Sequence, residues 1–162
     1  MRKAIYPGTF DPPHRGHVDL IERGRRLVDE LIVAVAINRD KRALFTAEER
    51  VALIERSLRS TDGVRIIPFD GLVVELMAAE GADFILRGIR TFTDFEAELA
   101  MAYTNRELAG NHHAETLFVL PRLEYSHYSS RRVKEVASFG GAVDHFLPDA
   151  IRDDVAARLP RR

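Results

Sequence analysis

The sequence predicts an α/β fold built on a five-stranded parallel sheet, and three observations lead to this prediction. Five short apolar runs alternate with amphipathic stretches of helical character along the chain. The run Leu31 to Ile37 spans seven residues and is rich in β-branched side chains, which is typical of a strand buried on both faces. Helical stretches between consecutive strands form right-handed crossovers, so the strands that they join are expected to be parallel.

In the first half of the chain, two helices are expected between three strands. The stretch 17–28 places apolar side chains, Val18 and Ile21 among them, on one helical face. Thr46 and Glu49 have the spacing of a capping box, in which each side chain binds the other residue's backbone N–H. In chain order we expect strand 3–6, helix 17–28, strand 31–37, a helix capped by Thr46 and ending near 58, and strand 64–68.

The second half continues this alternation, and its helix ends are marked by particular residues. Gly81 follows an apolar helical stretch, and glycine is the usual residue just past a helix end. Thr93 and Glu96 have the spacing of a second capping box, and Ser129 or Ser130 can cap a later helix. We expect helix 72–80, strand 83–86, helix 93–108, strand 116–120, helix 129–139 and a last helix at 149–159.

The composition indicates one domain spanning residues 1–162. There are 24 Lys and Arg residues against 25 Asp and Glu, so the formal net charge is −1 and nucleic acid is not expected as a partner. The longest apolar run has seven residues, far below the ~18 that a membrane helix needs, so no membrane partner is expected. Pro7 and Gly8 interrupt the N-terminal segment, which we expect to belong to the folded domain rather than to a signal peptide.

Cysteine is absent from the sequence. Its absence excludes disulfides, thiol nucleophiles and cysteine-ligated zinc. A chain without cysteine also suits a reducing compartment, so we expect a cytoplasmic protein.

The segment between the first strand and the first helix, residues 8–17, carries the strongest indication of a site. Ligands of parallel sheets bind at the carboxyl ends of the strands, where this segment begins. His14 and His17 are three residues apart and can share one side of the helix start, where backbone N–H groups favour an anion. We therefore expect a phosphate site, although either histidine could merely cap the helix. No Gly-Lys-Ser/Thr and no Gly-x-Gly-x-x-Gly motif is present, which excludes the common P-loop and dinucleotide motifs.

Three further strand ends carry charged or hydroxyl side chains. Residues 38–42 contain three cations, which either face an anion or form a solvated surface loop. Arg87 and Arg90 flank Gly88, and their guanidinium groups can bind phosphate oxygens in pairs. Hydroxyls in the segment 125–131 can bind an anion or cap a helix. His112 and His113 lie in a polar linker without a carboxylate at ligand spacing, so they are not expected to bind a metal. Asp94 and Glu96 complement a helix dipole, whereas Glu98 is not explained by capping.

Together these motifs resemble a known family. His14-Arg15-Gly16-His17 resembles the (His/Thr)-x-Gly-His motif of the nucleotidyltransferase superfamily, and nearly the whole chain is similar to the bacterial phosphopantetheine adenylyltransferase family. The motifs that carry the resemblance are Tyr6 to Pro12, Gly16 to Asp19, Lys41, Phe45-Thr46 with Glu48 to Arg50, Arg87 to Arg90, Asp94 to Glu96 with Glu98, Asn105-Arg106, Ser129-Ser130 and Val133 to Val136.

The resemblance implies a fold and a reaction. The fold is a doubly wound, Rossmann-like sheet with helices on both faces. The reaction is a direct in-line adenylyl transfer from ATP to 4′-phosphopantetheine, which gives dephospho-coenzyme A and pyrophosphate in coenzyme A biosynthesis. It also implies Mg²⁺ held mainly by the substrate phosphates, with no protein ligand, together with a homohexamer and coenzyme A as an inhibitor.

The resemblance also implies roles for individual residues. The implied catalytic set consists of His17, Lys41 and Arg90. His17 would stabilise the transferred α-phosphate, and Lys41 would bridge the phosphates of the two substrates. Thr9, Lys41, Val73 and Arg87 match phosphopantetheine contacts. The residues that match ATP contacts are Thr9, Phe10, His14, His17, Gly88, Ile89, Arg90, Glu98, Tyr125, Ser126, His127, Tyr128, Ser129, Ser130 and Arg131.

Two alternatives remain open at this point. Pro13-His14-Arg15 resembles the nicotinate-nucleotide adenylyltransferases, whose acceptor is nicotinate mononucleotide, although the Tyr-Pro-Gly opening and the short chain differ from them. A non-catalytic nucleotide-binding module would need the phosphate site but not both His17 and Lys41. Ala97 and Arg131 depart from the family pattern and leave the detailed adenine and pantetheine contacts undetermined.

Overall fold

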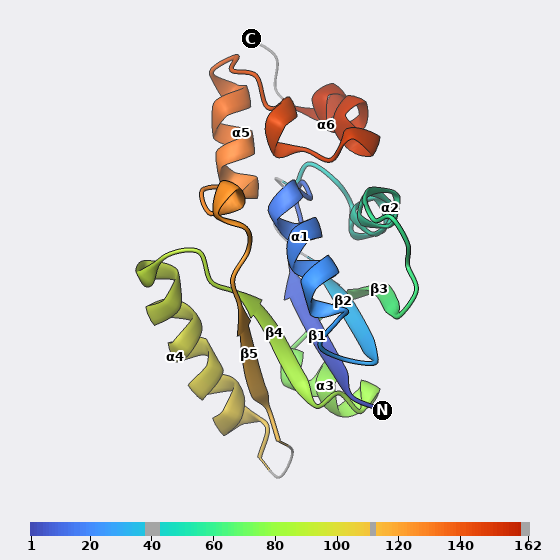
Figure 1. Ribbon diagram of the computed structural model, residues 1–162, viewed down its shortest axis with the longest axis vertical. Helices are drawn as coiled ribbons and strands as arrows, with labels where there is room; N and C mark the ends of the chain where they lie inside the picture. Colours follow the sequence, from blue (N-terminus) through green and yellow to red (C-terminus); the bar gives the residue numbers. More distant parts are fainter. Residues whose placement is uncertain (38–42, 111–112, 160–162) are drawn as a thin grey trace.

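A computed structural model describes residues 1–37, 43–110 and 113–159. It contains a five-stranded sheet in the order β3-β2-β1-β4-β5, and every neighbouring pair is parallel (Figure 1). This confirms the predicted parallel α/β sheet. The strands are β1 Lys3–Gly8, β2 Glu30–Ala36, β3 Val64–Phe69, β4 Phe84–Gly88 and β5 Glu115–Val119.

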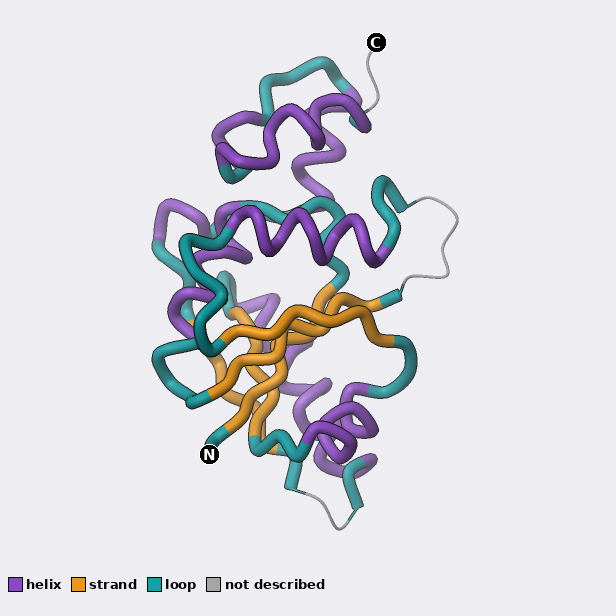
Figure 2. The backbone as a smooth tube through the Cα atoms, turned by 90° about the vertical axis from the view of Figure 1, so that its right-hand side faces the viewer, coloured by secondary structure: helices purple, strands orange, loops and turns teal. Residues whose placement is uncertain are grey.

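The sheet is doubly wound, as predicted. The chain builds it from β1 outward to β3 and then crosses back to place β4 on the other side of β1. The connections after β1 and β4 therefore diverge at their carboxyl ends, which is where open α/β sheets bind ligands. Helices cover both faces (Figure 2). They are α1 Arg15–Gly24, α2 Ala47–Ser57, α3 Val73–Glu80, α4 Phe92–Leu108, α5 Ser130–Ser138 and α6 Arg152–Arg158.

The two faces of the sheet pack separate cores because successive strand residues point to opposite sides. Leu31, Val33 and Val35 of β2 pack on one face with residues of α1 and α2. Ile32 and Ala34 pack on the other face with residues of α3. The all-apolar run that predicted β2 is therefore explained by burial on both sides.

A third cluster of apolar side chains lies beyond the carboxyl edge of the sheet. It joins α5, α6 and the turns near them to α2 through buried residues such as Leu53, Val133 and Val155. Figure 1 shows α5 and α6 at the end of the molecule toward which β1 and β4 run. This packing holds the N-terminus of α5 close to the strand ends.

Local capping signals place several helix ends where they were expected. Thr46 caps α2, since its hydroxyl accepts from the Glu49 N–H at 3.2 Å while the Glu49 carboxylate accepts from the Thr46 N–H at 2.8 Å. Gly81 ends α3 with a φ of 61°, a conformation that glycine adopts without strain. Ser129 caps α5.

Other boundaries differ from expectation. Helix α1 is Arg15–Gly24 rather than 17–28. It begins earlier because His14 caps it, and residues 25–28 form a turn and a bend instead of continuing the helix. Strand β4 continues through Arg87 and Gly88, which pair with β5 instead of forming a loop. Helix α4 is capped by Thr91 rather than Thr93, because the Thr91 hydroxyl accepts from the Asp94 N–H at 3.1 Å. The last helix opens with a 3₁₀ turn at Asp149–Ile151 before α6 begins.

In the described parts of the chain, no helix has the length and apolar character that a membrane crossing requires.

Candidate active site

A cavity of about 270 Å³ lies at the carboxyl ends of β1 and β4, at the point where the sheet changes direction. It brings together three of the four predicted segments: 8–17, 87–90 and 125–131. Of the predicted site residues, those that line it are Thr9, Phe10, His14, His17, Arg87, Gly88, Arg90, Glu98, Tyr125, Ser129 and Ser130.

His14 and His17 both cap α1 and both face the cavity. The Nδ1 of His14 accepts from the Gly16 N–H at 3.1 Å, and the Nδ1 of His17 accepts from the His14 N–H at 3.2 Å. A neutral imidazole that accepts at Nδ1 carries its proton on Nε2, so these contacts assign the Nε2–H tautomer to both rings. The two interpretations offered by the sequence, cap and ligand contact, are therefore compatible.

Both imidazoles are neutral at physiological pH. Burial, assisted by the positive charge of Arg90, lowers the pKa of His17 to about 3. Burial, with additional contributions from His17 and Arg90, holds the pKa of His14 well below its usual range. The rings stack with centroids 3.6 Å apart, so a charge on one would also oppose a charge on the other. Each ring therefore serves as a neutral N–H donor and not as a cation.

The lowered pKa predicts a loss of stability in acid. Between the unfolded pKa of 6.5 and the folded value of about 3, the unfolded chain binds more protons at His17 than the folded protein does. Acidification from pH 8 to pH 5 is therefore expected to reduce the free energy of unfolding by on the order of 2 kcal/mol through His17. Urea unfolding at both pH values, with His17→Asn as the comparison, checks this. The variant should lose less stability than the wild type, and equal losses would contradict the assignment.

Phe10 builds the wall against which His17 lies. Its ring is buried and meets the His17 ring edge-on, with centroids 4.8 Å apart. The backbone of Phe10 has a φ of 53°, in the left-handed region, and this conformation turns the ring back over Gly8. A Cβ on Gly8 would lie 2.8 Å from that ring, so any other residue at this position would displace the ring of Phe10. The segment therefore orients His17 through packing as well as through the helix cap.

Arg87 and Glu98 form a paired contact across the cavity wall. Two nitrogens of the guanidinium donate to the two carboxylate oxygens, each at 2.6 Å, and Nη1 donates to the Pro7 carbonyl at 2.9 Å. This explains Glu98, which helix capping did not. The pair ties α4 to the ends of β1 and β4 and neutralises much of the charge of Arg87.

Arg90 is held from two sides. Its Nε donates to Asp94 at 2.9 Å, and its Nη1 donates to the Tyr128 carbonyl at 2.7 Å. Asp94 therefore orients Arg90 in addition to complementing the dipole of α4. A guanidinium has five N–H donors, and these contacts leave others available to a ligand.

The N-terminus of α5 closes the cavity opposite β1. The Ser129 hydroxyl accepts from the Arg132 N–H at 3.1 Å, and the Ser130 hydroxyl donates to the Pro12 carbonyl at 2.8 Å. Both serines and the first residues of α1 line the cavity, so two helix N-termini face it. Helix N-termini favour anions. With Arg90 and two imidazole N–H donors, the cavity suits a polyanionic ligand.

Some predicted residues lie elsewhere. Ile89 is buried beside Arg90 but does not line this cavity. Val73 packs with the α3 core, and Tyr128 is buried in the cluster that holds α5. Ser126, His127 and Arg131 are also absent from the cavity wall, so the proposed ATP and phosphopantetheine contacts of all these residues stay predictions. Lys41, its neighbours in 38–42 and His112 lie outside the described residues.

Four further residues of the cavity wall were not predicted as site residues: Tyr6, Pro7, Leu20 and Pro121. Burial raises the pKa of the Tyr6 hydroxyl above its usual value, so this group is a neutral donor or acceptor. Its position just before Pro7 at the end of the first strand was the available signal. No signal in the sequence marked Leu20 as a site residue. It belongs to the apolar face of α1 and reaches the cavity only because α1 packs on β4.

The fold and the cavity together define a class of protein. A parallel sheet whose first strand leads through His14-Arg15-Gly16-His17 into a helix, with a cavity at the strand ends whose lining suits an anion, has the features of a nucleotidyltransferase. In agreement, the family model described as cytidylyltransferase-like matches residues 5–136.

Curated relatives define the family more narrowly. A phosphopantetheine adenylyltransferase of Synechococcus sp. is 50% identical over 154 residues, which cover 95% of this chain and 92% of the relative. Phosphopantetheine adenylyltransferases of Aquifex aeolicus and Clostridium perfringens are 47% and 45% identical, and each match covers 98% of this chain and 96% of the relative. The chain therefore belongs to the phosphopantetheine adenylyltransferase family, which confirms the resemblance.

Solved structures with low sequence identity share the fold. A bifunctional NMN adenylyltransferase/ADP ribose pyrophosphatase of Francisella tularensis superposes with a TM-score of 0.70 at 13% identity. The match covers 96% of this chain, which spans only about half (48%) of that longer protein. A lipopolysaccharide core biosynthesis protein of Thermoplasma volcanium gives a TM-score of 0.53 at 24% identity, covering 72% of this chain and 96% of that one. These similarities support the α/β fold alone.

Proposed function

We propose that this protein transfers the adenylyl group of ATP to 4′-phosphopantetheine, giving dephospho-coenzyme A and pyrophosphate in coenzyme A biosynthesis. The observation that carries this proposal is the cavity at the β1–β4 switch point, in which two neutral histidine donors, Arg90 and two helix N-termini converge. The acceptor is assigned from the nearly full-length relatives that are named for it.

The proposed reaction is a direct in-line displacement. A phosphate oxygen of 4′-phosphopantetheine attacks the α-phosphorus of ATP, the new P–O bond forms, and the bond to the β-phosphate oxygen breaks with release of pyrophosphate. The attacking oxygen is already ionised at neutral pH, so no general base and no covalent enzyme intermediate are needed. The protein has to bring two polyanions together and stabilise the charge of the transition state.

The residues at the cavity suit this task in different ways. The Nε2–H of His17 is proposed to donate to the α-phosphate, and Arg90 supplies fixed positive charge from the opposite wall. His14, Thr9 and the α5 N-terminus are proposed to hold the remaining phosphates. Arg87 is proposed to contact phosphopantetheine, with much of its charge balanced by Glu98. Lys41 keeps its predicted role as a bridge between the phosphates of the two substrates.

Mg²⁺ is proposed to reach the site on the triphosphate. Within residues 1–37, 43–110 and 113–159, no three His, Cys, Asp or Glu side chains form a group suited to a metal ion. The cavity-lining carboxylate of Glu98 is paired with Arg87. Phosphate oxygens are therefore the proposed ligands, and the ion would neutralise part of their charge.

The protein is proposed to assemble as a homohexamer in the cytoplasm, and coenzyme A is proposed to inhibit its activity. Helix α4 supports self-association, because several of its large apolar side chains are exposed. Phe92 is 93% exposed, and Met101, Tyr103 and Leu108 are each more than half exposed. Apolar surface of this extent is common at protein interfaces.

The experiment that tests the proposed reaction is pyrophosphate release from ATP with each acceptor in turn. We expect release with 4′-phosphopantetheine and at least a hundredfold less with nicotinate mononucleotide, because a few matched polar contacts separate acceptors by such factors. Preferential use of nicotinate mononucleotide would establish the alternative acceptor. Tight ATP binding without release from either acceptor would instead indicate a non-catalytic nucleotide-binding module.

A further inference from the structure

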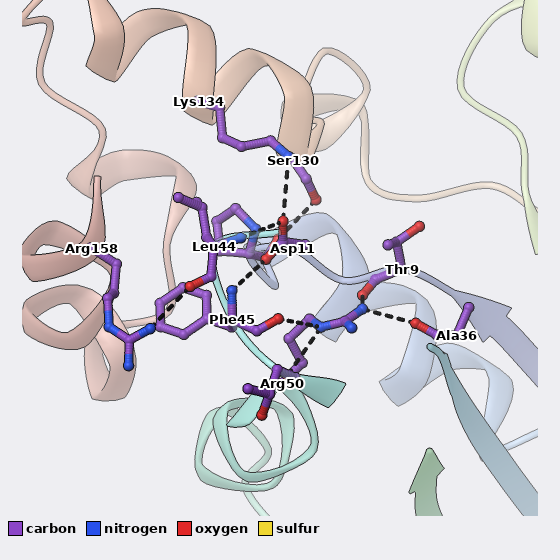
Figure 3. Close-up of polar contacts among 11 residues, drawn as sticks. Thr9, Asp11, Ala36, Leu44, Phe45, Arg50, Ser130, Lys134 and Arg158 are labelled. Atoms are coloured by element: carbon purple, nitrogen blue, oxygen red, sulfur yellow. Dashed lines mark hydrogen bonds and ion pairs between the residues drawn. The ribbon is translucent and has the colours of Figure 1, made fainter. Parts of the chain in front are cut away.

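Arg50 of α2 is buried beneath the segment that forms the cavity wall. Its side chain is only 2% exposed and does not line the cavity. The guanidinium donates to four backbone carbonyls (Figure 3). Nη1 donates to Thr9 and, at 3.0 Å, to Ala36, and Nε donates to Phe45 and Thr46, both at 3.1 Å.

These carbonyls belong to three separate parts of the fold. Thr9 lies in the cavity wall, Ala36 is the last residue of β2, and Phe45 and Thr46 lead into α2. The planar fork of one guanidinium therefore sets the distance between the first cavity segment and the end of the neighbouring strand. A lysine ammonium has its donors on a single nitrogen and cannot span the same set.

Asp11 holds the same region from the other side. Its buried carboxylate accepts from the Leu44 N–H at 3.0 Å and the Phe45 N–H at 3.1 Å, and it lies 3.4 Å from the Lys134 ammonium (Figure 3). Phe45 is thus bound at its N–H by Asp11 and at its carbonyl by Arg50. The segment Thr9 to Asp11 is therefore connected to the backbone at Phe45 at both ends. Thr9 is connected through the Arg50 guanidinium, and Asp11 is connected through its own carboxylate.

Burying this guanidinium is costly. In the part of the chain that the structure describes, no carboxylate lies within ion-pair distance of Arg50, and its hydrogen-bond partners are carbonyl groups. Burial lowers the pKa of Arg50, and the charges of Asp11 and Glu48 offset this only in part. Apolar side chains can often replace a buried charge without loss of stability. The arginine at this position is better explained by the geometry that it imposes than by the stability that it adds.

We propose that Arg50 is a positioning residue for adenylyl transfer, which holds the backbone of Thr9 and Phe10 where Phe10 supports His17. This inference rests on the proposed function. Arg50 acts through the cavity wall and touches no substrate itself. Because a displacement of about 1 Å in a reacting group can cost a factor of 100 in rate, a shift of this segment affects turnover more than ATP binding.

The test compares Arg50→Lys with Arg158→Lys. Arg158 is a matched control, because it donates to the Leu44 carbonyl at 3.1 Å and to Glu49 at 2.6 Å but does not reach Thr9. We expect kcat to fall about tenfold or more in R50K, with the KM for ATP within about threefold of wild type. In R158K, kcat should stay within about twofold, and thermal unfolding should show both variants folded.

Two results would overturn the proposal. One is a kcat of R50K within about twofold of wild type, and the other is an equal loss of kcat in both variants. If R50K does not fold, Arg50→Gln replaces it, since it removes the buried charge and reaches fewer carbonyls. The same fall in kcat is expected for R50Q, and unchanged turnover in that variant would again overturn the proposal.

A second measurement separates this inference from the proposed function. If the wild-type protein releases no pyrophosphate with 4′-phosphopantetheine, the proposed function fails, and hydrogen exchange then decides the role of Arg50. The Phe45 N–H, which is bonded to Asp11, should exchange faster in R50K than in wild type or R158K. Equal exchange in all three proteins would overturn the positioning role.

Discussion

Replacing His17 by alanine is expected to lower kcat by about 10²- to 10³-fold, the range that the loss of one oxyanion donor produces, while the affinity for ATP should change only a few-fold. The ring is neutral, its Nδ1 accepts from the His14 N–H, and its Nε2–H is available in the cavity. A donor fixed in this way loses nothing to reorganisation when charge develops on the α-phosphate. Steady-state kinetics and calorimetric ATP binding measure the two quantities.

Two further substitutions at His17 separate catalysis from helix capping. Asparagine keeps an acceptor near the position of Nδ1, so His17→Asn should remain folded. It lacks a donor near the position of Nε2, so its kcat should be low. Glutamine places an N–H donor near the position of Nε2, so His17→Gln should keep more activity than His17→Asn. The exposed His113 provides the control, since His113→Ala should be indistinguishable from wild type. Near-normal turnover of His17→Ala would disprove the assigned role.

Replacing Arg90 by alanine is expected to lower kcat/KM for ATP by about 10²- to 10³-fold, because it removes fixed positive charge from the cavity. Lysine should restore only part of the loss. Its ammonium cannot keep the contacts with Asp94 and the Tyr128 carbonyl while it also faces a phosphate. Initial rates at varied ATP concentration check both substitutions.

Arg106 is the matched control for Arg90. It lies on α4, whereas Arg90 lies just before that helix. Arg106 also forms an ion pair, with Glu115 at 2.8 Å, but both side chains are more than half exposed and it does not line the cavity. Arg106→Ala should leave kcat/KM within about twofold of wild type, since exposed ion pairs contribute little. Equal effects at the two positions would show that the Arg90 result reflects general charge rather than its place in the cavity.

Features that depend on a few consecutive residues were predicted correctly from the sequence. The Thr46–Glu49 capping box and the glycine that ends α3 are such features, because each involves groups within four residues of one another. The strand β2 was recognised by its apolar run, whose burial on both faces follows from the helices of the two layers. The first helix start was placed two residues late, because a histidine cap is unusual and serine, threonine, aspartate and asparagine are the expected caps.

The contacts that orient the site residues were not predictable in this way. Each of these contacts joins residues that are far apart in the sequence. The separation is 11 residues for Arg87 and Glu98, 38 residues for Arg90 and the Tyr128 carbonyl, and 41 residues for Arg50 and the Thr9 carbonyl. Nothing in residue type or spacing indicates such partners, because they meet only after the sheet and its helices have packed. The neutral state of His17 has the same origin, since burial lowers its pKa.

The sequence by itself determined the α/β class, the order of strands and helices and most of the residue types that line the cavity. It did so because hydrophobic periodicity and capping act over short stretches of chain. The tertiary structure alone decided which of the predicted residues share one cavity, which protonation state and tautomer the histidines adopt and how Arg50 and Asp11 hold the cavity wall. These properties depend on burial and on long-range hydrogen bonds, and both arise only when distant segments come together.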